Sequence, residues 1–387
     1  MNSKYDVIII GGAATGSSIA YFLKILSPAC TVAVIEPDPT YEFASTPRAS
    51  GGARRQFSCP ENIAMSNFSI PFIKNFAEHM AVKGEPAHVD WHEGGYLFIV
   101  PKHAQGMLRE NYELQLAAGV RADWLDQAGL KSRFPSMTVD DLAAGVHTLE
   151  DGWCDPNGLL QGFRRKARSL GVEYIQDKVT GIGSDATAVR TVRLASGTSL
   201  AAGSFVNAAG AWAKQICAMV GMPLPIEPLR RFEHFFETPN KIEPLPYVKD
   251  LQRLAFRPEG RGYSGGLVNS DQTRGYNFEV DHGYFDNIVW PALAHRFPAF
   301  EACRCVRTWS GLYEQNELDG NPVIGAGVLP NFFVAAGFSG HGMMHAPAAG
   351  RAVAELIAHG RFETLDLSRL GYGRIKANTA YPERGIV

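Results

Sequence analysis

The order of apolar and polar residues predicts a strand, a helix and a second strand at the start of the chain. Residues 5–10 (YDVIII) end in four consecutive apolar residues, residues 16–26 repeat apolar side chains at helical spacing, and residues 31–36 (TVAVIE) form a second apolar run. Short apolar runs rich in Val and Ile are typical of strands that are covered on both faces, as in a parallel sheet. The segment therefore predicts a βαβ unit.

Further along, the pattern predicts three more helices and several strands. The helices are expected at 62–81, with a break near Pro71, at 106–118 and at 159–170. Strands are expected in EGGYLFIV (93–100), in GVEYIQ (171–176), at the start of SFVNAAGAWA (204–213) and, by alternation, through 223–308. Residues 331–357 return to a strand, a glycine-rich loop and a helix.

The order of these segments predicts an α/β fold with two interwoven domains. A Rossmann-like nucleotide-binding domain is expected to combine residues 1–85, 145–222 and 309–387, because the strand–helix pattern occurs at both ends and in the middle. An α+β substrate domain, built on a largely antiparallel sheet, is expected from residues 86–144 and 223–308. The chain of 387 residues is long enough for two such domains.

Composition narrows the possible partners. The formal net charge of −2 argues against a nucleic acid partner. No apolar run is long enough to span a membrane, and no signal peptide precedes the first predicted strand, so a cytoplasmic location is expected. The six cysteines are scattered, and the pair Cys303 and Cys305 has no further metal ligands nearby. We therefore expect reduced thiols and no metal site.

The first predicted strand runs into a glycine-rich loop that nearly matches the dinucleotide fingerprint. Glycines stand at the first and third fingerprint positions, 11 and 16, but the middle position is Ala13. Alanine keeps its backbone N–H and is tolerated there if its φ is negative. The loop is therefore predicted to bind phosphates at a helix N-terminus, through Gly11, Gly12, Ala13, Ala14, Thr15 and Gly16. A ligand-free turn is the alternative.

An acidic residue follows at the expected distance. Glu36 ends the second strand, twenty residues after Gly16, where a carboxylate accepts hydrogen bonds from a ribose and repels a 2′-phosphate. The fingerprint alone does not distinguish NAD from FAD. FAD is favoured because no second fingerprint is present to hold a nicotinamide, and because the glycine loop in 331–357 places another helix N-terminus toward the same cofactor.

Four motifs, in this order, resemble the D-amino-acid oxidase superfamily of FAD proteins, which includes sarcosine oxidase, glycine oxidase and dimethylglycine dehydrogenase. They are VIIIGGAATGSSIAYFL, ASTPRASGGARRQFS, VNAAGAWA and GFSGHGMMHAPAAGRAVAEL. Further segments are similar to one branch, that of the mitochondrial FAD-dependent oxidoreductase domain-containing protein linked to respiratory complex I assembly: SGGARRQFSCPEN, EPLRRFEHFFETP, FRPEGRGYSGG and GRFETLDLS.

The resemblance implies which residues contact FAD beyond the first loop and Glu36. They are Ser50, Gly51, Gly52, Val179, Ala209, Gly210, Trp212, Gly311, Gly337, Ser339, Gly340, His341, Gly342, Met343 and Met344. Covalent attachment is not expected, because Gly311 stands where sarcosine oxidase has its flavin-linked cysteine and no histidine precedes His79. The FAD is therefore expected to be non-covalent.

The expected catalytic residues are Arg54 and Tyr313, which the resemblance implies, and His341, the base that a 2-hydroxy acid substrate would need. Substrate contacts are expected from Arg54, Arg55, Phe57, Tyr313 and Met344. A solvated charge pair is the alternative for the two arginines, and a place in the core is the alternative for Tyr313. Phe57 and Met344 replace the arginine and lysine that hold the substrate carboxylate in sarcosine oxidase, which favours a substrate larger than sarcosine.

The function implied is oxidation of a C–N bond in an amino acid or secondary amine, with hydride transfer to flavin N5. A dehydrogenase is favoured over an oxidase, because residues 250–375 contain no lysine to assist reaction with oxygen. The electron acceptor stays open among oxygen, a quinone and an electron-transfer protein. The alternatives are a 2-hydroxy acid dehydrogenase, with His341 as base, and a flavin-bound assembly or subunit protein with little turnover.

Overall fold

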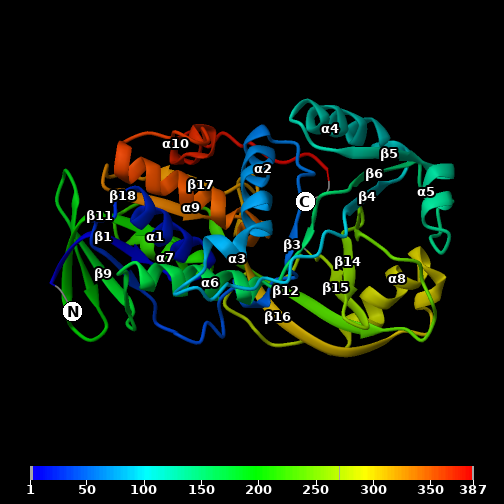
Figure 1. Ribbon diagram of the computed structural model, residues 1–387, viewed down its shortest axis with the longest axis horizontal. Coiled ribbons are helices and arrows are strands. Elements are labelled where there is room, and N and C mark those ends of the chain that lie inside the picture. The colour runs from blue at the N-terminus through cyan, green and yellow to red at the C-terminus, as the bar shows by residue number, and fades with distance from the viewer. Residues whose placement is uncertain (1–2, 270, 386–387) are drawn as a thin grey trace.

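The computed structural model describes residues 3–269 and 271–385, which form two β-sheets with helices packed around them (Figure 1). The first sheet contains the predicted βαβ unit, and its central strand pairs are parallel. Its main strands lie in the order β17 (Val323–Ala326), β18 (Phe332–Ala336), β11 (Ser199–Asn207), β1 (Lys4–Ile10), β2 (Val32–Ile35) and β8 (Glu173–Ile175). Strands β9 (Val179–Ser184) and β10 (Val189–Leu194) extend from β11.

The first sheet is covered on both faces, as the unbroken apolar runs predicted. In β1, Val7 and Ile9 pack in one apolar cluster, and Ile8 and Ile10 pack in another. The first cluster contains side chains of α1 (Ala14–Leu26), α6 (Pro156–Ser169) and α9 (Gly342–His359). The second contains α7 (Ala213–Ala218). These four strand residues are at most 4% exposed, which explains why no polar residue interrupts the run.

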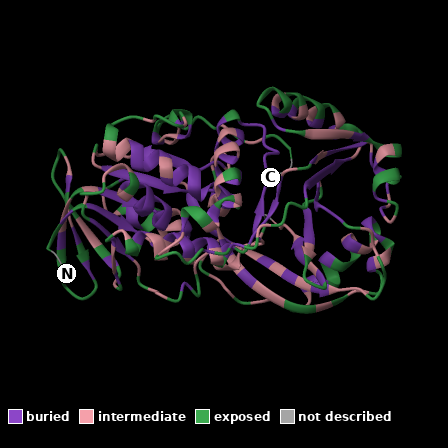
Figure 2. Cartoon of the chain, viewed as in Figure 1, coloured by how far each residue is buried: buried purple, intermediate pink, exposed green. Residues whose placement is uncertain are grey.

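The second sheet is largely antiparallel, as predicted, and only the β13–β4 pair is parallel among its described strands. Its strands lie in the order β16 (Arg304–Asn316), β12 (Ile226–Glu237), β15 (Gly262–Leu267), β14 (Leu254–Glu259), β13 (Tyr247–Asp250), β4 (Tyr96–Val100), β6 (Ala144–Thr148) and β5 (Ala122–Asp126). Buried and partly exposed residues alternate along β12, as expected for a sheet with one covered face (Figure 2).

The remaining elements are short or lie at the edges of the two sheets. They are β3 (Gly52–Ala53), which pairs with β7 (Gly152–Trp153), and the helices α2 (Pro60–Lys74), α3 (Phe76–His79), α4 (Gln105–Ala117), α5 (Gln127–Arg133), α8 (Trp290–Arg296) and α10 (Tyr372–Lys376). Single helical turns occupy Thr46–Arg48, Lys102–Ala104, Gly210–Trp212, Phe285–Val289, Pro298–Phe300 and Ser368–Leu370. Among the described residues, none of these helices is long and apolar enough to cross a membrane.

Three expectations about the elements need correction. The helix predicted at 62–81 is interrupted at Asn75 and not at Pro71. A proline removes only one backbone N–H donor, and α2 continues past Pro71 to Lys74. The predicted domain boundaries at 144/145 and 308/309 fall inside β6 and β16, and both strands pair wholly within the second sheet. Helix α8 lies in a region expected to contain only strands.

The contact between α1 and α9 generates a testable prediction. A Cβ on Gly350, in α9, would lie 2.1 Å from the Ser18 hydroxyl oxygen and 2.7 Å from the Ser18 Cβ, whereas a Cβ on Gly106, in α4, would meet nothing within 4 Å. Gly350→Ala should therefore lower the free energy of unfolding by roughly 1–3 kcal/mol through overpacking. Gly106→Ala should cause no loss, because alanine favours a helix. Urea titration of both variants measures this, and equal stabilities would contradict it.

Candidate active site

The glycine loop after β1 has the close backbone approaches that its sequence predicted. Gly11 has φ +98°, and a Cβ there would lie 2.4 Å from the Ala208 carbonyl oxygen. A Cβ on Gly16 would lie 1.9 Å from the Gly11 carbonyl oxygen. Ala13 has φ −69°, the negative value that tolerates a methyl group. The departure at the middle fingerprint position therefore leaves the turn into α1 intact.

Glu36 lies directly beneath this turn. Its carboxylate accepts hydrogen bonds from the backbone N–H of Gly12 at 2.9 Å and of Asp38 at 3.0 Å. Burial raises the pKa of Glu36, while these two N–H groups act in the opposite direction. The carboxylate faces a cavity of about 390 Å³, the nucleotide cavity, which is lined in part by Gly11, Ala13, Thr15, Glu36, Val179, Ala209, Gly210 and Trp212.

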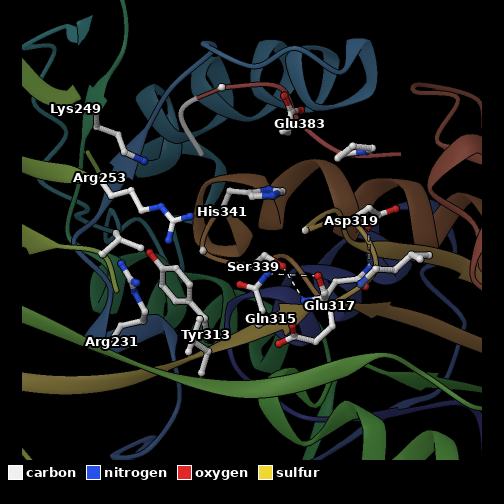
Figure 3. A pocket seen from close by; sticks show the side chains of 18 of the residues that line it. Arg231, Lys249, Arg253, Tyr313, Gln315, Glu317, Asp319, Ser339, His341 and Glu383 are labelled. Atoms are coloured by element: carbon white, nitrogen blue, oxygen red, sulfur yellow. Dashed lines mark hydrogen bonds between the residues drawn. The ribbon is translucent and has the colours of Figure 1, made fainter. Parts of the chain in front are cut away.

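On the side of the second sheet, the nucleotide cavity is adjacent to further spaces. Thr15, Thr46 and Glu314 line both this cavity and a narrower region, the connecting space. The connecting space is bordered by Ser50, Gly51, Gly52, Gly311, Gly340, Gly342, Met343 and Met344. Arg54 and Tyr313 line both it and a further cavity of about 520 Å³, the substrate cavity. Figure 3 shows Tyr313 and His341 in the wall of this cavity. The shared residues place these spaces in a row, called the path below, from the glycine turn after β1 to the predicted catalytic residues.

Contacts from the second sheet hold the loop Ser50–Gly52 at the edge of the connecting space. The Tyr247 hydroxyl donates to Ser50 Oγ at 3.0 Å, and Arg257 Nε donates to the Ser50 carbonyl oxygen at 2.7 Å. A Cβ on Gly52 would lie 1.9 Å from the Tyr96 hydroxyl oxygen. The glycine thus allows the two domains to approach closely here.

The loop before α9 forms the opposite border. Gly340 has φ +105°, and a Cβ there would lie 2.4 Å from the ring of Tyr313. Gly337 has φ +85° and donates its N–H to the Glu314 carboxylate at 2.8 Å, but it lines none of the three spaces. This loop therefore places His341, at the N-terminus of α9, in the wall of the substrate cavity.

These residues fit a bound FAD. The bare backbone at Gly11 and Gly16 suits a pyrophosphate, Glu36 suits the ribose, and the glycine-bordered connecting space suits a flat ring. Among the described residues, no cysteine lines the path. A Cβ on Gly311 would lie 3.1 Å from the Cβ of Arg48. The surroundings therefore offer no thiol for a covalent link.

The structure places Arg54, Tyr313 and His341 together in the wall of the substrate cavity, and their catalytic role stays a prediction. The Arg54 guanidinium lies 4.3 Å from the centre of the Phe57 ring, and its Nη2 atom is buried without a hydrogen-bond partner. Phe57 itself lies behind Arg54 and contacts His341, with ring centres 5.4 Å apart, and does not line the substrate cavity. Met344 borders the connecting space instead.

Arg55, also predicted to contact substrate, points away from the substrate cavity. Its guanidinium binds the Asp151 carboxylate at 2.7 Å and the Asn67 side-chain oxygen at 3.0 Å. Burial raises the pKa of Asp151, and Arg55 opposes this rise. Asp151 also accepts the Arg55 backbone N–H at 2.8 Å. Arg55 is therefore a structural residue in this arrangement, and its part in substrate binding is not retained.

His341 belongs to a buried chain of three polar side chains. Its Nδ1 lies 3.1 Å from Nδ1 of His345, and Nε2 of His345 lies 2.9 Å from the Ser66 hydroxyl. Burial, with a smaller contribution from Arg54, lowers the pKa of His341 to about 3. The imidazole facing the cavity is therefore neutral near pH 7.

Three basic residues of the substrate cavity were missed: Arg231, Lys249 and Arg253. Lys249 immediately precedes the lysine-free stretch 250–375. Its register partners on the next two strands are Ala255 and Gly266, so its side chain lies across two small residues. Burial and the charges of Arg54 and Arg231 lower the pKa of Lys249 well below its ordinary value. A single sequence carries no signal for a lysine buried in this way.

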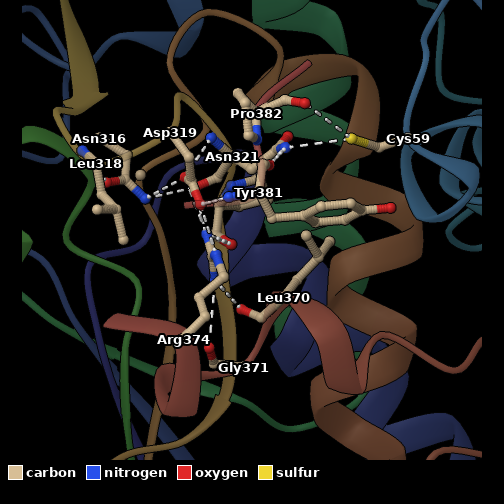
Figure 4. Close-up of polar contacts among 12 residues, drawn as sticks. Cys59, Asn316, Leu318, Asp319, Asn321, Leu370, Gly371, Arg374, Tyr381 and Pro382 are labelled. Carbon is tan, nitrogen blue, oxygen red and sulfur yellow. Dashed lines mark hydrogen bonds and ion pairs between the residues drawn. The ribbon is translucent and has the colours of Figure 1, made fainter. Parts of the chain in front are cut away.

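Acidic residues line the other end of the substrate cavity. Asp319 binds Arg374 at 2.8 Å and accepts the Tyr381 backbone N–H at 3.1 Å (Figure 4). Asn321 donates to the Tyr381 carbonyl oxygen at 2.6 Å. These contacts attach the C-terminal segment to the cavity, and Glu383 from that segment lines it.

The placement of Arg55 generates a prediction about stability. Asp151→Asn leaves the buried Arg55 charge without a carboxylate and should lower the free energy of unfolding by about 3–5 kcal/mol. The control is Asp123→Asn, which breaks a surface pair with Arg133 and should cost at most about 1 kcal/mol. Denaturant unfolding measures both, and a similar loss in the two variants would contradict this role.

Comparisons with known proteins agree with this geometry. A family model described as DAO, FAD dependent oxidoreductase, matches residues 6–356. FAD-dependent oxidoreductase domain-containing protein 1 of Xenopus laevis is 38% identical, over 99% of this chain and 85% of its own. Sarcosine oxidase subunit beta of Rhizobium meliloti (strain 1021) is 27% identical, over 92% of this chain and 85% of its own. The crystal structure of L-proline dehydrogenase from P. horikoshii has a TM-score of 0.88 and 26% identity, covering 98% of this chain and 100% of its own. The chain belongs to the DAO family of FAD-dependent oxidoreductases.

Proposed function

We propose that the protein oxidises the C–N bond of an amino acid or secondary amine to an imine, which then hydrolyses in water. The observation that carries the proposal is the convergence of Arg54 and Tyr313 on a cavity joined to the nucleotide cavity. Similar proteins are named for sarcosine and L-proline, and both compounds are secondary amines with one carboxylate. FAD, when bound, supplies the hydride acceptor for this chemistry.

In this proposal the chain binds and orients the substrate. Arg54 holds the carboxylate, because its Nη2 is buried without a partner and a carboxylate completes its hydrogen bonds. Tyr313 lies at the border of the substrate cavity and the connecting space, where its hydroxyl hydrogen-bonds the same ligand. The substrate cavity of about 520 Å³ leaves room for a substrate larger than sarcosine.

The 2-hydroxy acid alternative requires a base for the alcohol proton. His341 Nε2 is buried without a hydrogen-bond partner, which suits a proton acceptor. However, a general base works best with a pKa near the working pH, and burial lowers the pKa of His341 to about 3. This difference favours amine oxidation, which needs only a neutral amine. A role in assembly with little turnover is the other alternative, and the cytoplasmic location stays a prediction.

The structure removes the reason for expecting a dehydrogenase and not an oxidase. That expectation rested on the absence of a nearby lysine, but Lys249 lines both the connecting space and the substrate cavity. Assays of turnover should therefore be run with dioxygen and with an artificial acceptor in parallel.

Cofactor content provides the first test. The purified protein should be yellow, and acid precipitation should release its flavin as free FAD, because no thiol lines the path. Gly16→Leu should abolish flavin content, since a side chain there meets the Gly11 carbonyl oxygen. Gly373→Leu is the control, because a Cβ at Gly373 meets nothing within 4 Å. Flavin retained in the pellet, or full loading of Gly16→Leu, would contradict the proposed binding mode.

Substrate affinity provides the second test. Removing one partner of a buried charged hydrogen bond costs roughly 2–5 kcal/mol, so Arg54→Met should raise the dissociation constant about 30-fold to several thousand-fold. Anaerobic titration of the flavin spectrum with the best amino acid measures this. Arg307→Met, at an exposed position on β16, is the control. Unchanged affinity in Arg54→Met, or efficient use of sarcosine by the unmodified protein, would show that the pocket is misassigned.

A further inference from the structure

One end of the substrate cavity is more positively charged than a single carboxylate requires. Arg54, Arg231, Lys249 and Arg253 all line the cavity. The charged ends of Lys249, Arg253 and Arg231 lie on the Tyr313 side of the cavity, away from Glu317 and Asp319 (Figure 3). The cationic end, defined here as Arg54, Arg231 and Lys249, is not explained by a substrate with one carboxylate.

Among the described residues, no carboxylate forms an ion pair with the cationic end, although Asp250, which directly follows Lys249, also lines the cavity. Arg54, Arg231 and Lys249 form no ion pair there, and Arg54 Nη2 and Arg231 Nε are buried without hydrogen-bond partners. Glu233 is a nearby carboxyl, but it accepts a hydrogen bond from Ser264, and burial raises its pKa to about 7. The protein therefore compensates this positive charge only in part, because Asp250 and Glu233 lie nearby without forming an ion pair with it.

The acidic end is different, because its carboxylates are already bound. Asp319 pairs with Arg374 at 2.8 Å, and Glu317 pairs with Arg274 at 2.6 Å. Glu383 accepts the hydroxyl of Ser58 at 2.6 Å and the backbone N–H of Cys59 at 3.1 Å. A ligand entering the cavity therefore meets unsatisfied basic groups at one end and carboxylates that are already ion-paired or hydrogen-bonded at the other.

We propose that the cationic end binds a second anionic group, so that the substrate is an amino acid or secondary amine carrying a further carboxylate. This rests on the proposed function. Arg54 holds the carboxylate next to the amine, and Arg231 and Lys249 hold the second one. Like charges buried together are unfavourable, and a dianion removes their repulsion and completes their hydrogen bonds. A cavity of about 520 Å³ accommodates such a molecule.

Contacts with aromatic rings place the three basic side chains near one another in the cavity wall. Arg54 and Lys249 lie against the same ring, with the Arg54 guanidinium 5.5 Å and the Lys249 ammonium 5.9 Å from the centre of Phe98. Arg231 lies against Tyr313, its guanidinium 4.7 Å from the ring centre. The three cations thus line adjoining parts of one wall, held by aromatic rings that offer no negative charge.

The test compares two ligands that differ by one carboxylate and cannot be oxidised at a C–N bond, oxydiacetate and methoxyacetate. Isothermal titration calorimetry with the FAD-loaded protein should show oxydiacetate binding at least about tenfold more tightly. Arg231→Met and Lys249→Met should each reduce that preference to less than about threefold while methoxyacetate still binds. Arg230→Met is the matched control, because the neighbouring Arg230 binds Gln272 and Glu279 outside the cavity.

Equal affinity of the two ligands for the unmodified protein would overturn the proposal without any variant. Preference retained in both Arg231→Met and Lys249→Met would show that the cations serve another role, such as stabilising the cofactor. Both variants should fold, because each removes repulsion, and their melting temperatures should not fall below that of Arg230→Met. The titration requires no turnover, so a protein that prefers oxydiacetate but oxidises no amine would contradict the proposed function and not this inference.

Discussion

The close approach of α1 to the turn after β1 is the constraint on which both ends of the active site depend. A Cβ on Gly16 would lie 1.9 Å from the Gly11 carbonyl oxygen, so the helix starts where phosphates can reach its N–H groups. The same helix packs against α9 at Gly350. Since α9 begins at Gly342, directly after His341, these two contacts of α1 position the nucleotide turn and the wall of the substrate cavity relative to each other.

The charged side chains along the path differ in whether the protein itself supplies their partners. Glu36 is held by backbone N–H groups, and Asp319 is held by Arg374, so their charges are compensated within the protein. Arg54 and Arg231 have buried nitrogen atoms with no partner. A buried polar group without a partner is unfavourable, and an anionic ligand in the cavity would supply the missing hydrogen bonds. The substrate specificity that we infer therefore depends on the nitrogen atoms of Arg54 and Arg231 that have no hydrogen-bond partner in the protein.

The sequence predicted the features that depend on local pattern, and missed those that depend on distant partners. The turn at Gly11 and Gly16 could be predicted from the sequence because the spacing of the glycines determines the local backbone conformation. Arg54 and Arg55 are neighbours with the same chemistry, and only Asp151, 96 residues from Arg55, decides that one faces the cavity and the other does not. Lys249 reaches the cavity through strand register with Gly266, which no local pattern reveals. The domain boundaries were misplaced because apolar alternation continues through β16 after the predicted division.

Amine oxidation can be tested most directly with paired substrates under anaerobic conditions. The FAD-loaded protein is mixed with an N-methyl amino dicarboxylic acid or with the 2-hydroxy acid of the same carbon skeleton, and the visible absorbance of the oxidised flavin is followed. The account predicts that the amine bleaches the flavin and that the hydroxy acid does not. Bleaching by the hydroxy acid alone would contradict it.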